Sequence, residues 1–166
     1  MRTLGRGLFA TLWILALVAC AGTPRFSVDE GVAEVSPREA KRDMASLEGS
    51  RVLWGGVIVN TTNLEDRTRL EILAYPLDGR QKPDVEADPR GRFLAEAEGY
   101  LETADYAPGR RVTVSGTLEE TRKGRIGEAE YTYPVVEVAD QELWTEDRRA
   151  PEGPRFHFGI GVIFGG

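Results

Sequence analysis

The chain has 166 residues, which allows one domain and a leader, and 41% of them are hydrophobic while 29% are charged. This composition is that of an ordinary globular protein and excludes a disordered or a collagen-like chain. The formal net charge is −6 at pH 7. Because an acidic surface repels phosphate backbones, we expect no nucleic acid among the partners of this protein.

The N-terminal segment has the pattern of a secretory signal peptide. Residues 7–20 carry no charge, and only Arg2 and Arg6 precede them as basic residues. A basic start followed by an apolar run of about a dozen residues is typical of such a signal. The run is shorter than the roughly 20 residues that a helix needs to cross a bilayer. We therefore predict that residues 1–19 are removed and that the exported chain has no transmembrane helix.

The single cysteine, Cys20, stands at the end of this apolar run. Leu17, Val18 and Ala19 before it resemble the lipobox of bacterial lipoproteins, which implies a diacylglycerol on the sulfur and an acyl chain on the new amino group. These covalent lipids are the only prosthetic groups that we expect, and two or more acyl chains hold a protein stably on a membrane. The alternative is a buried structural cysteine. Ala21 is not the Asp that retains lipoproteins in the inner membrane of enteric-type bacteria, so the outer membrane is the expected destination.

The next segment is expected to be a tether followed by a short helix. Residues 20–35 lack periodicity and contain Gly and Pro, which is typical of a linker. Ser36, Pro37 and Glu39 then form the signature of a capped helix start with a capping box. We expect a helix of about ten residues that ends near Gly49.

From residue 51 onward the pattern changes to that of β-strands. Gly55 and Gly56 interrupt the first strand and predict a sharp bend or a bulge there. A basic segment at residues 121–127 predicts the tip of a hairpin. Five strands with short connections favour a mainly β fold over 36–144, a small five-stranded OB-like barrel, with a small β-sandwich as the alternative. The expected strands are residues 52–60, 68–77, 92–101, 111–118 and 131–138.

Several stretches of this β region resemble a known family. They read VLWGGVIVNT, TRLEILAYPLD, GRFL, GRRVTVSGTL and IGEAEYTYPVVEV, followed by a closing LW. In this order and spacing they are similar to the Slp family, the starvation-inducible outer-membrane lipoproteins of Gram-negative bacteria. The resemblance covers roughly residues 36–144. It implies a lipid-anchored protein of the outer membrane, a role in stationary phase or stress, and no catalytic residues.

No pattern in the sequence predicts a catalytic or metal site. The acids between Asp84 and Asp88 are spaced like those of a calcium loop, but Pro89 and Ala95 occupy the positions of its Gly and bidentate Glu. His157 is the only histidine and has no partner nearby in the sequence. We therefore expect a solvated acidic loop, no metal site and no enzyme.

Two further groups of residues could bind ligands. The basic residues within 122–125 could contact lipid phosphates, although charges on a turn are usually solvated. Four aromatic side chains could stack nucleobases in an OB-type groove, but packing in the core is the expected role of Trp54, Tyr131, Tyr133 and Trp144.

The C-terminal segment, residues 145–166, is expected to be a polar linker followed by a tail rich in Gly and apolar residues. Large apolar side chains occupy alternate positions of this tail. It could be a last strand on the barrel, or a separate tail that contacts the membrane or a partner. The residues concerned are Phe156, Phe158, Ile160, Val162 and Phe164.

The leading functional prediction is a non-enzymatic envelope lipoprotein, held on outer-membrane lipid through Cys20 and facing the periplasm. Its barrel would bind an unknown envelope protein under stress. The alternative is a binding module for a lipid or another small apolar ligand. An enzyme ranks third, because no convergent titratable residues are visible in the sequence.

Overall fold

The computed structural model describes residues 25–27 and 31–145. Two short helices precede five β-strands. None of the helices among these residues has the length and hydrophobicity to cross a membrane. The elements are α2 (Pro37–Ala40), α3 (Met44–Leu47), β1 (Arg51–Asn63), β2 (Arg67–Tyr75), β3 (Arg92–Glu98), β4 (Arg111–Ile126) and β5 (Ala129–Trp144).

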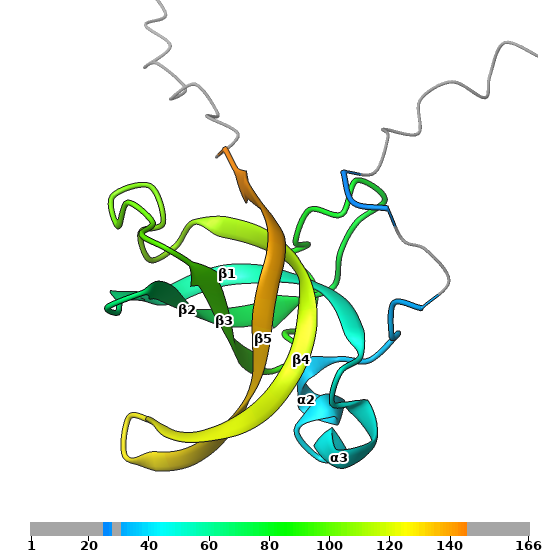
Figure 1. Ribbon diagram of the computed structural model, residues 1–166. Helices are drawn as coiled ribbons and strands as arrows, with labels where there is room; N and C mark the ends of the chain where they lie inside the picture. The colour runs from blue at the N-terminus through cyan, green and yellow to red at the C-terminus, as the bar shows by residue number, and fades with distance from the viewer. Residues whose placement is uncertain (1–24, 28–30, 146–166) are drawn as a thin grey trace, which may run out of the picture.

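The five strands form a closed barrel in the order β1-β2-β3-β5-β4, and β4 closes it on β1 (Figure 1). Only β3 and β5 pair in parallel, and the other four pairs are antiparallel. This five-stranded closed barrel confirms the predicted mainly β, OB-like fold. Closure pairs both sides of β4 over residues 111–117, whereas the part of the β4–β5 hairpin beyond the barrel is paired only within itself.

The core follows the alternation of apolar side chains along the strands. Inward positions of β2, β3 and β4 carry the residues that the alternation predicts, and their side chains are almost completely buried. A single cluster of them fills the barrel interior, as expected for a small barrel. Its buried members are Ala40, Val52, Trp54, Ile58, Leu70, Ile72, Ala74, Phe93, Ala95, Val112, Val114, Leu118 and Val136.

The glycine pair in β1 does not form the predicted bulge. The pairing of β1 with β2 runs unbroken through Gly55 and Gly56, and the register shift lies later, between Ile58 and Asn60. A Cβ atom on Gly56 would collide with the backbone of Leu73 on β2. The glycine is therefore required because two backbones approach closely, which is the other common reason for glycine in a strand.

The strands are longer than the sequence predicts, most clearly in β4 and β5. Of the segment 121–127, predicted as a hairpin tip, residues 121–126 belong to β4, and only Gly127 lies at the tip, with Glu128, between the paired residues Ile126 and Ala129. Polar residues hide the strand character of the β4 half of this hairpin, because residues 119–125 show no apolar alternation on either face. In Figure 1 this long hairpin curves around the barrel and extends past it.

The predicted helix is shorter than expected and is divided in two. The capping box is present: Glu39 N–H donates to Ser36 Oγ, and the Ser36 N–H donates to the Glu39 carboxylate at 2.8 Å. The first helix nevertheless ends at Ala40, and the second begins at Met44. Ala40 is fully buried, whereas the second helix contacts the core only through the partly buried Met44 and Leu47.

Candidate functional site

A groove lies on the outside of the barrel, where the outer faces of β2 and β3 meet the far half of the β4–β5 hairpin. It has a volume of about 230 Å³. Four cationic residues and one acidic residue line it, although the whole chain has a net charge of −6. We call it the basic groove, and its lining residues are Asn60, Thr62, Arg69, Glu71, Leu94, Arg122, Lys123, Gly124, Arg125 and Tyr133.

The groove exists because the hairpin folds back over the outer face of β3. Leu94 points out of the barrel, yet it is only 8% exposed because Tyr133 and Val135 of β5 pack on it. Ile126 and Tyr131 extend this small second cluster. The burial of apolar area outside the barrel thus fixes the hairpin, and the hairpin carries the basic residues to the face of β2 and β3.

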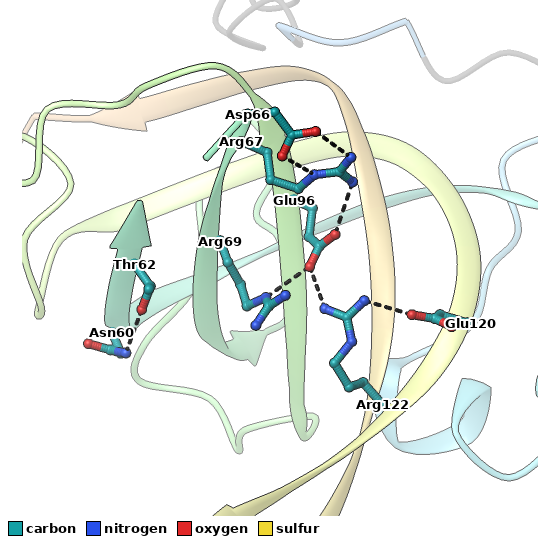
Figure 2. A network of polar contacts seen from close by, with 8 residues as sticks. All are labelled: Asn60, Thr62, Asp66, Arg67, Arg69, Glu96, Glu120 and Arg122. Atoms are coloured by element: carbon teal, nitrogen blue, oxygen red, sulfur yellow. Dashed lines mark hydrogen bonds and ion pairs between the residues drawn. The ribbon is translucent and has the colours of Figure 1, made fainter. Parts of the chain in front are cut away.

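Glu96 of β3 is the centre of the polar network beside this groove. Its carboxylate accepts hydrogen bonds from Arg69 Nε at 2.8 Å, from Arg67 Nη1 at 3.3 Å and from Arg122 (Figure 2). The three arginines come from two different parts of the sheet, since Arg69 is the cross-strand partner of Glu96 and Arg122 reaches it from the hairpin. Glu96 is 8% exposed, so the pairs are largely shielded from solvent.

Two outer acids complete the network. Asp66 binds Arg67 through both of its oxygens, each at 3.1 Å, and Glu120 accepts from Arg122 Nη2 at 2.7 Å (Figure 2). Arginine presents its donors as a planar fork, so each carboxylate limits the orientations of the guanidinium that it holds. The arginines at the groove are therefore held in place before any ligand arrives.

The pKa of Glu96 reflects two opposing effects. Burial raises the pKa of this carboxyl group, but the hydrogen bonds from Arg122 and Arg69 outweigh it and keep the pKa below its ordinary value. Glu96 is therefore ionised at neutral pH. The three arginines are balanced in charge by Glu96, Asp66 and Glu120, so the positive excess of the groove comes from Lys123 and Arg125.

Tyr133 and Glu71 form the floor of the groove. The Tyr133 hydroxyl donates to Glu71 Oε1 at 3.1 Å, and Arg92 Nη1 donates to the same oxygen at 2.6 Å. Burial, together with the negative charge of Glu71, raises the pKa of Tyr133 to about 12. The phenol is thus a neutral hydrogen-bonding group at neutral pH and not a nucleophile.

The remaining lining residues add hydrogen-bond donors. Lys123 and Arg125 are exposed on β4, and the amide of Asn60 donates to Thr62 Oγ1 at 3.3 Å. Guanidinium, ammonium and amide groups together form a set suited to carboxylate or phosphate oxygens. Within the described ranges, no group of three or more His, Cys, Asp or Glu residues could hold a metal ion.

The residues predicted to carry the membrane attachment lie outside the described residues. These are Leu17, Val18, Ala19, Cys20 and Ala21 at the N-terminus and the apolar tail residues between Phe156 and Phe164. The same holds for His157. Their predicted roles stay predictions.

The prediction of core packing holds for Trp54 only: Tyr133 and the half-buried Tyr131 belong to the second cluster outside the barrel, and Trp144 is half-buried outside both clusters. Trp54 meets Phe93 edge to face with ring centroids 5.1 Å apart, and Tyr131 meets Tyr133 in the same way at 4.7 Å. Trp144 donates its indole N–H to Thr113 Oγ1 at 2.9 Å. Because these rings contact other side chains, none of them is arranged as an open stacking platform in the groove.

Sequence reasoning identified only part of the groove. The basic segment 122–125 was predicted as a solvated turn, but Arg122 is paired with two carboxylates and lies within a strand. Glu96 and Arg69 were not singled out at all, because charged residues on the outward face of a strand are normally solvated. The signal that could have revealed them is Leu94, an apolar residue on that same outward face.

Comparisons with known proteins come from sequence and from structure. The model of the Outer membrane lipoprotein Slp family matches residues 17–160. An uncharacterized protein of Haemophilus influenzae is 36% identical over 139 residues, covering 83% of this chain and 75% of that protein. The uncharacterized lipoprotein YeaY of Escherichia coli is 29% identical, covering 96% of this chain and 86% of that protein. The Outer membrane protein Slp of Escherichia coli is 34% identical over 96 residues, covering 58% of this chain and 50% of that protein.

The predicted exclusion of nucleic acid must be corrected. Solved structures similar to the barrel are a small single-stranded DNA-binding protein from Streptomyces coelicolor and the mitochondrial single-stranded DNA-binding protein Rim1 from S. cerevisiae. The TM-scores are 0.38 and 0.37, the identities are 17% and 14%, and the matches cover 57% and 58% of this chain and 94% and 95% of those chains. At this distance the likeness does not show that this chain binds nucleic acid. The negative net charge is, however, an insufficient reason to exclude nucleic acid as a partner. Charge is distributed unevenly over a protein surface, and the basic groove is a positively charged region on an acidic chain.

The family assignment therefore rests on the sequence match, which spans most of the chain, including the whole barrel. This chain belongs to the Slp family of outer membrane lipoproteins.

Proposed function

We propose that this protein is a non-enzymatic lipoprotein, anchored in the outer membrane through acylated Cys20, whose barrel binds an acidic segment of an envelope protein. The binding site is the basic groove, and the protein acts in stationary phase or envelope stress, facing the periplasm. The observation that carries the binding role is the excess of cationic donors in the groove of an acidic chain. The attachment is supported by the lipobox residues before Cys20 and by the family match.

An acidic protein segment fits the groove better than other anions for two reasons. Two of its arginines, Arg69 and Arg122, are already bound by the Glu96 carboxylate, so the site has carboxylate geometry built into it. Binding of single-stranded nucleic acid relies largely on aromatic stacking, and the ring at the groove, Tyr133, is only 4% exposed. The binding test below therefore also measures binding of a single-stranded nucleic acid.

The barrel interior does not support the alternative of an enclosed apolar ligand. Phe93, Leu70 and Ile72 fill it and are fully buried. Small barrels whose interior is filled in this way bind ligands on their outer faces or at their loops. The proposed function therefore uses the outside of the barrel.

The binding test compares two charge-matched double variants. In the first, Lys123→Gln with Arg125→Gln removes two positive charges from the groove. In the control, Arg42→Gln with Arg80→Gln removes two exposed positive charges elsewhere. The probe is a fluorescent oligoglutamate peptide, measured by anisotropy at several salt concentrations. We expect the groove variant to lose most of the binding and the control to keep it, with binding weakened by salt.

Two results would overturn the binding proposal. One is equal binding of the peptide to both double variants, which would mean that the groove is not the site. The other is a labelled oligothymidylate that binds in preference to the peptide with the same dependence on Lys123 and Arg125, which would make the ligand a nucleic acid.

The anchoring test is separate. The full chain and the Cys20→Ser variant are expressed with labelled palmitate in a Gram-negative host, and membranes are fractionated. We expect label and outer-membrane fractionation for the full chain only. If Cys20→Ser still fractionates with the outer membrane, the proposed attachment fails whatever the groove binds.

A further inference from the structure

The start of the described chain is fastened to the barrel by a buried glutamine. Phe26 is 6% exposed, and its backbone N–H donates to Gln81 Oε1 at 2.7 Å. Gln81 Nε2 donates in return to the Phe26 carbonyl oxygen at 2.8 Å. The side chain of Gln81 thus binds one residue of the N-terminal segment as a neighbouring strand would. We call this pair of hydrogen bonds the latch.

The latch is rigidly supported by the end of the barrel. Gln81 has a backbone φ of 65°, which is uncommon for a residue other than glycine, and its carbonyl oxygen accepts a hydrogen bond from Thr113 Oγ1 at 2.7 Å. Thr113 also accepts the indole N–H of Trp144. A continuous set of buried hydrogen bonds therefore joins Phe26, at the start of the described chain, to Trp144, at its end.

The latch lies at one end of the barrel, and the hairpin tip lies at the other. In the register of β4 and β5, Arg111 is opposite Trp144 at one end and Ile126 is opposite Ala129 at the other. Figure 1 shows the same arrangement: both ends of the described chain leave on one side, and the β4–β5 hairpin extends on the opposite side. At about 3.3 Å per residue, sixteen-residue strands separate the two ends by roughly 50 Å along their curved path.

We propose that the latch orients the barrel on the membrane, with the Phe26–Gln81–Trp144 end against the lipid surface and the hairpin directed away from it. This inference rests on the proposed acylation of Cys20. Only five residues then lie between the anchor and Phe26, and the six Cα–Cα steps limit their distance to roughly 20 Å even for a fully extended chain. Without the latch, the next backbone hydrogen bond to the barrel is that of Ala33 to Arg51, and the reach becomes roughly 45 Å.

The surface at this end fits a phospholipid headgroup layer. A hollow of about 740 Å³ lies here, and its charged lining residues balance in sign. Balanced charges match headgroups that carry both a phosphate and an amine, whereas the acidic surface of the rest of the chain repels anionic lipid. Trp144 and Thr145, the last described residues, also line this hollow. The charged residues of the hollow are Asp78, Arg80, Lys82, Asp84, Glu86 and Arg111.

The orientation is tested by energy transfer from the protein to a dye in the membrane. Because acylation occupies Cys20, the only cysteine, one introduced cysteine takes the donor dye. The full-length acylated Arg80→Cys and Glu128→Cys variants, both changed at exposed positions, are placed in phosphatidylethanolamine–phosphatidylglycerol vesicles with an acceptor-labelled lipid. We expect severalfold stronger transfer from position 80, near the latch, than from position 128, at the hairpin tip.

The role of the latch is tested by adding Gln81→Ala to the Arg80→Cys variant. We expect transfer from position 80 to fall, because the chain between anchor and barrel lengthens. Gln141→Ala is the matched control, since Gln141 donates its amide to Tyr106 Oη and does not contact Phe26. Circular dichroism verifies that both variants are folded.

The outcomes separate this inference from the proposed function. Variants that do not float with vesicles show that the acyl anchor is absent, and the proposed function then fails. Variants that float but give equal transfer from positions 80 and 128, or stronger transfer from 128, overturn the orientation alone. A Gln81→Ala variant that floats and keeps full transfer overturns the role of the latch.

Discussion

Glu96 and Gln81 are both nearly buried and both bind groups from distant parts of the chain, but they do so by different chemistry. Glu96 is charged, and three arginines compensate the cost of its burial. Gln81 is neutral, and two backbone groups of Phe26 satisfy its amide. The ion pairs of the charged centre, Glu96, should therefore respond to pH and salt. The hydrogen bonds of the neutral centre, Gln81, should not.

The largest expected effect comes from removing the charged centre. Glu96→Ala leaves three arginines close together without their shared carboxylate. Because these arginines are themselves partly exposed, we expect a loss of about 2–3 kcal/mol, somewhat less than for a fully buried pair. Urea unfolding measures it. The control is Glu98→Ala, on the exposed end of the same strand, which should change the free energy of unfolding by no more than about 0.5 kcal/mol. Equal losses of stability in the two variants would show that Glu96 does not hold the arginine network together.

Removing the neutral centre should cost less. Gln81→Ala leaves the N–H and carbonyl groups of Phe26 without partners at a buried position, for which we expect about 1–2 kcal/mol. The same change should also expose the segment around Phe26 to proteases, which mass spectrometry of the first cleavage products detects. If cleavage there is no faster than in Gln141→Ala, the amide does not hold the segment.

The two centres should differ in their response to pH. The folded pKa of Glu96 lies below its ordinary value, so its ionisation contributes stability above the unfolded pKa, about 4.3. That contribution is lost as the pH falls from there through the lower folded pKa. We expect the pH dependence of urea unfolding in this range to become shallower in Glu96→Gln and to stay unchanged in Gln81→Ala. An unchanged slope in Glu96→Gln would assign the acid sensitivity to other carboxyl groups.

The smallest expected effect lies at the edge of the charged network. Glu120 is 56% exposed and binds Arg122 alone in this network. Solvent screens such a pair, so Glu120→Gln should cost no more than about 0.5 kcal/mol in urea unfolding. A loss close to that of Glu96→Ala would mean that the outer acids are as important as the central one.

The sequence predicted the interior of the barrel well and its exterior poorly. Leu70, Ile72 and Phe93 alternate with polar residues, and this period of two identifies an inward face without any knowledge of the neighbouring strands. The same alternation assigns Glu96 to solvent. The assignment is wrong because the β4–β5 hairpin, more than twenty residues away in the sequence, packs over Glu96. A local sequence pattern contains no information about such a distant contact.

The neutral centre escaped sequence analysis for a related reason. Gln81 lies in a loop rich in Asp, Pro and Gly, where a glutamine is normally solvated, and Phe26 lies in a segment expected to be a linker. They are 55 residues apart. Their pairing depends on where the barrel places the loop, which is a property of the closed sheet and not of either segment.

Local patterns in this protein therefore established what depends on neighbouring residues: the capping box at Ser36 and the inward face of each strand. Tertiary structure alone decided what depends on residues far apart in the chain. Sheet closure brings Phe26, Gln81 and Trp144 to one end of the barrel, and the folded-back hairpin surrounds Glu96 with arginines from β2 and β4. The reason is physical: burial is a property of the assembled surface, whereas alternation and capping act within one segment.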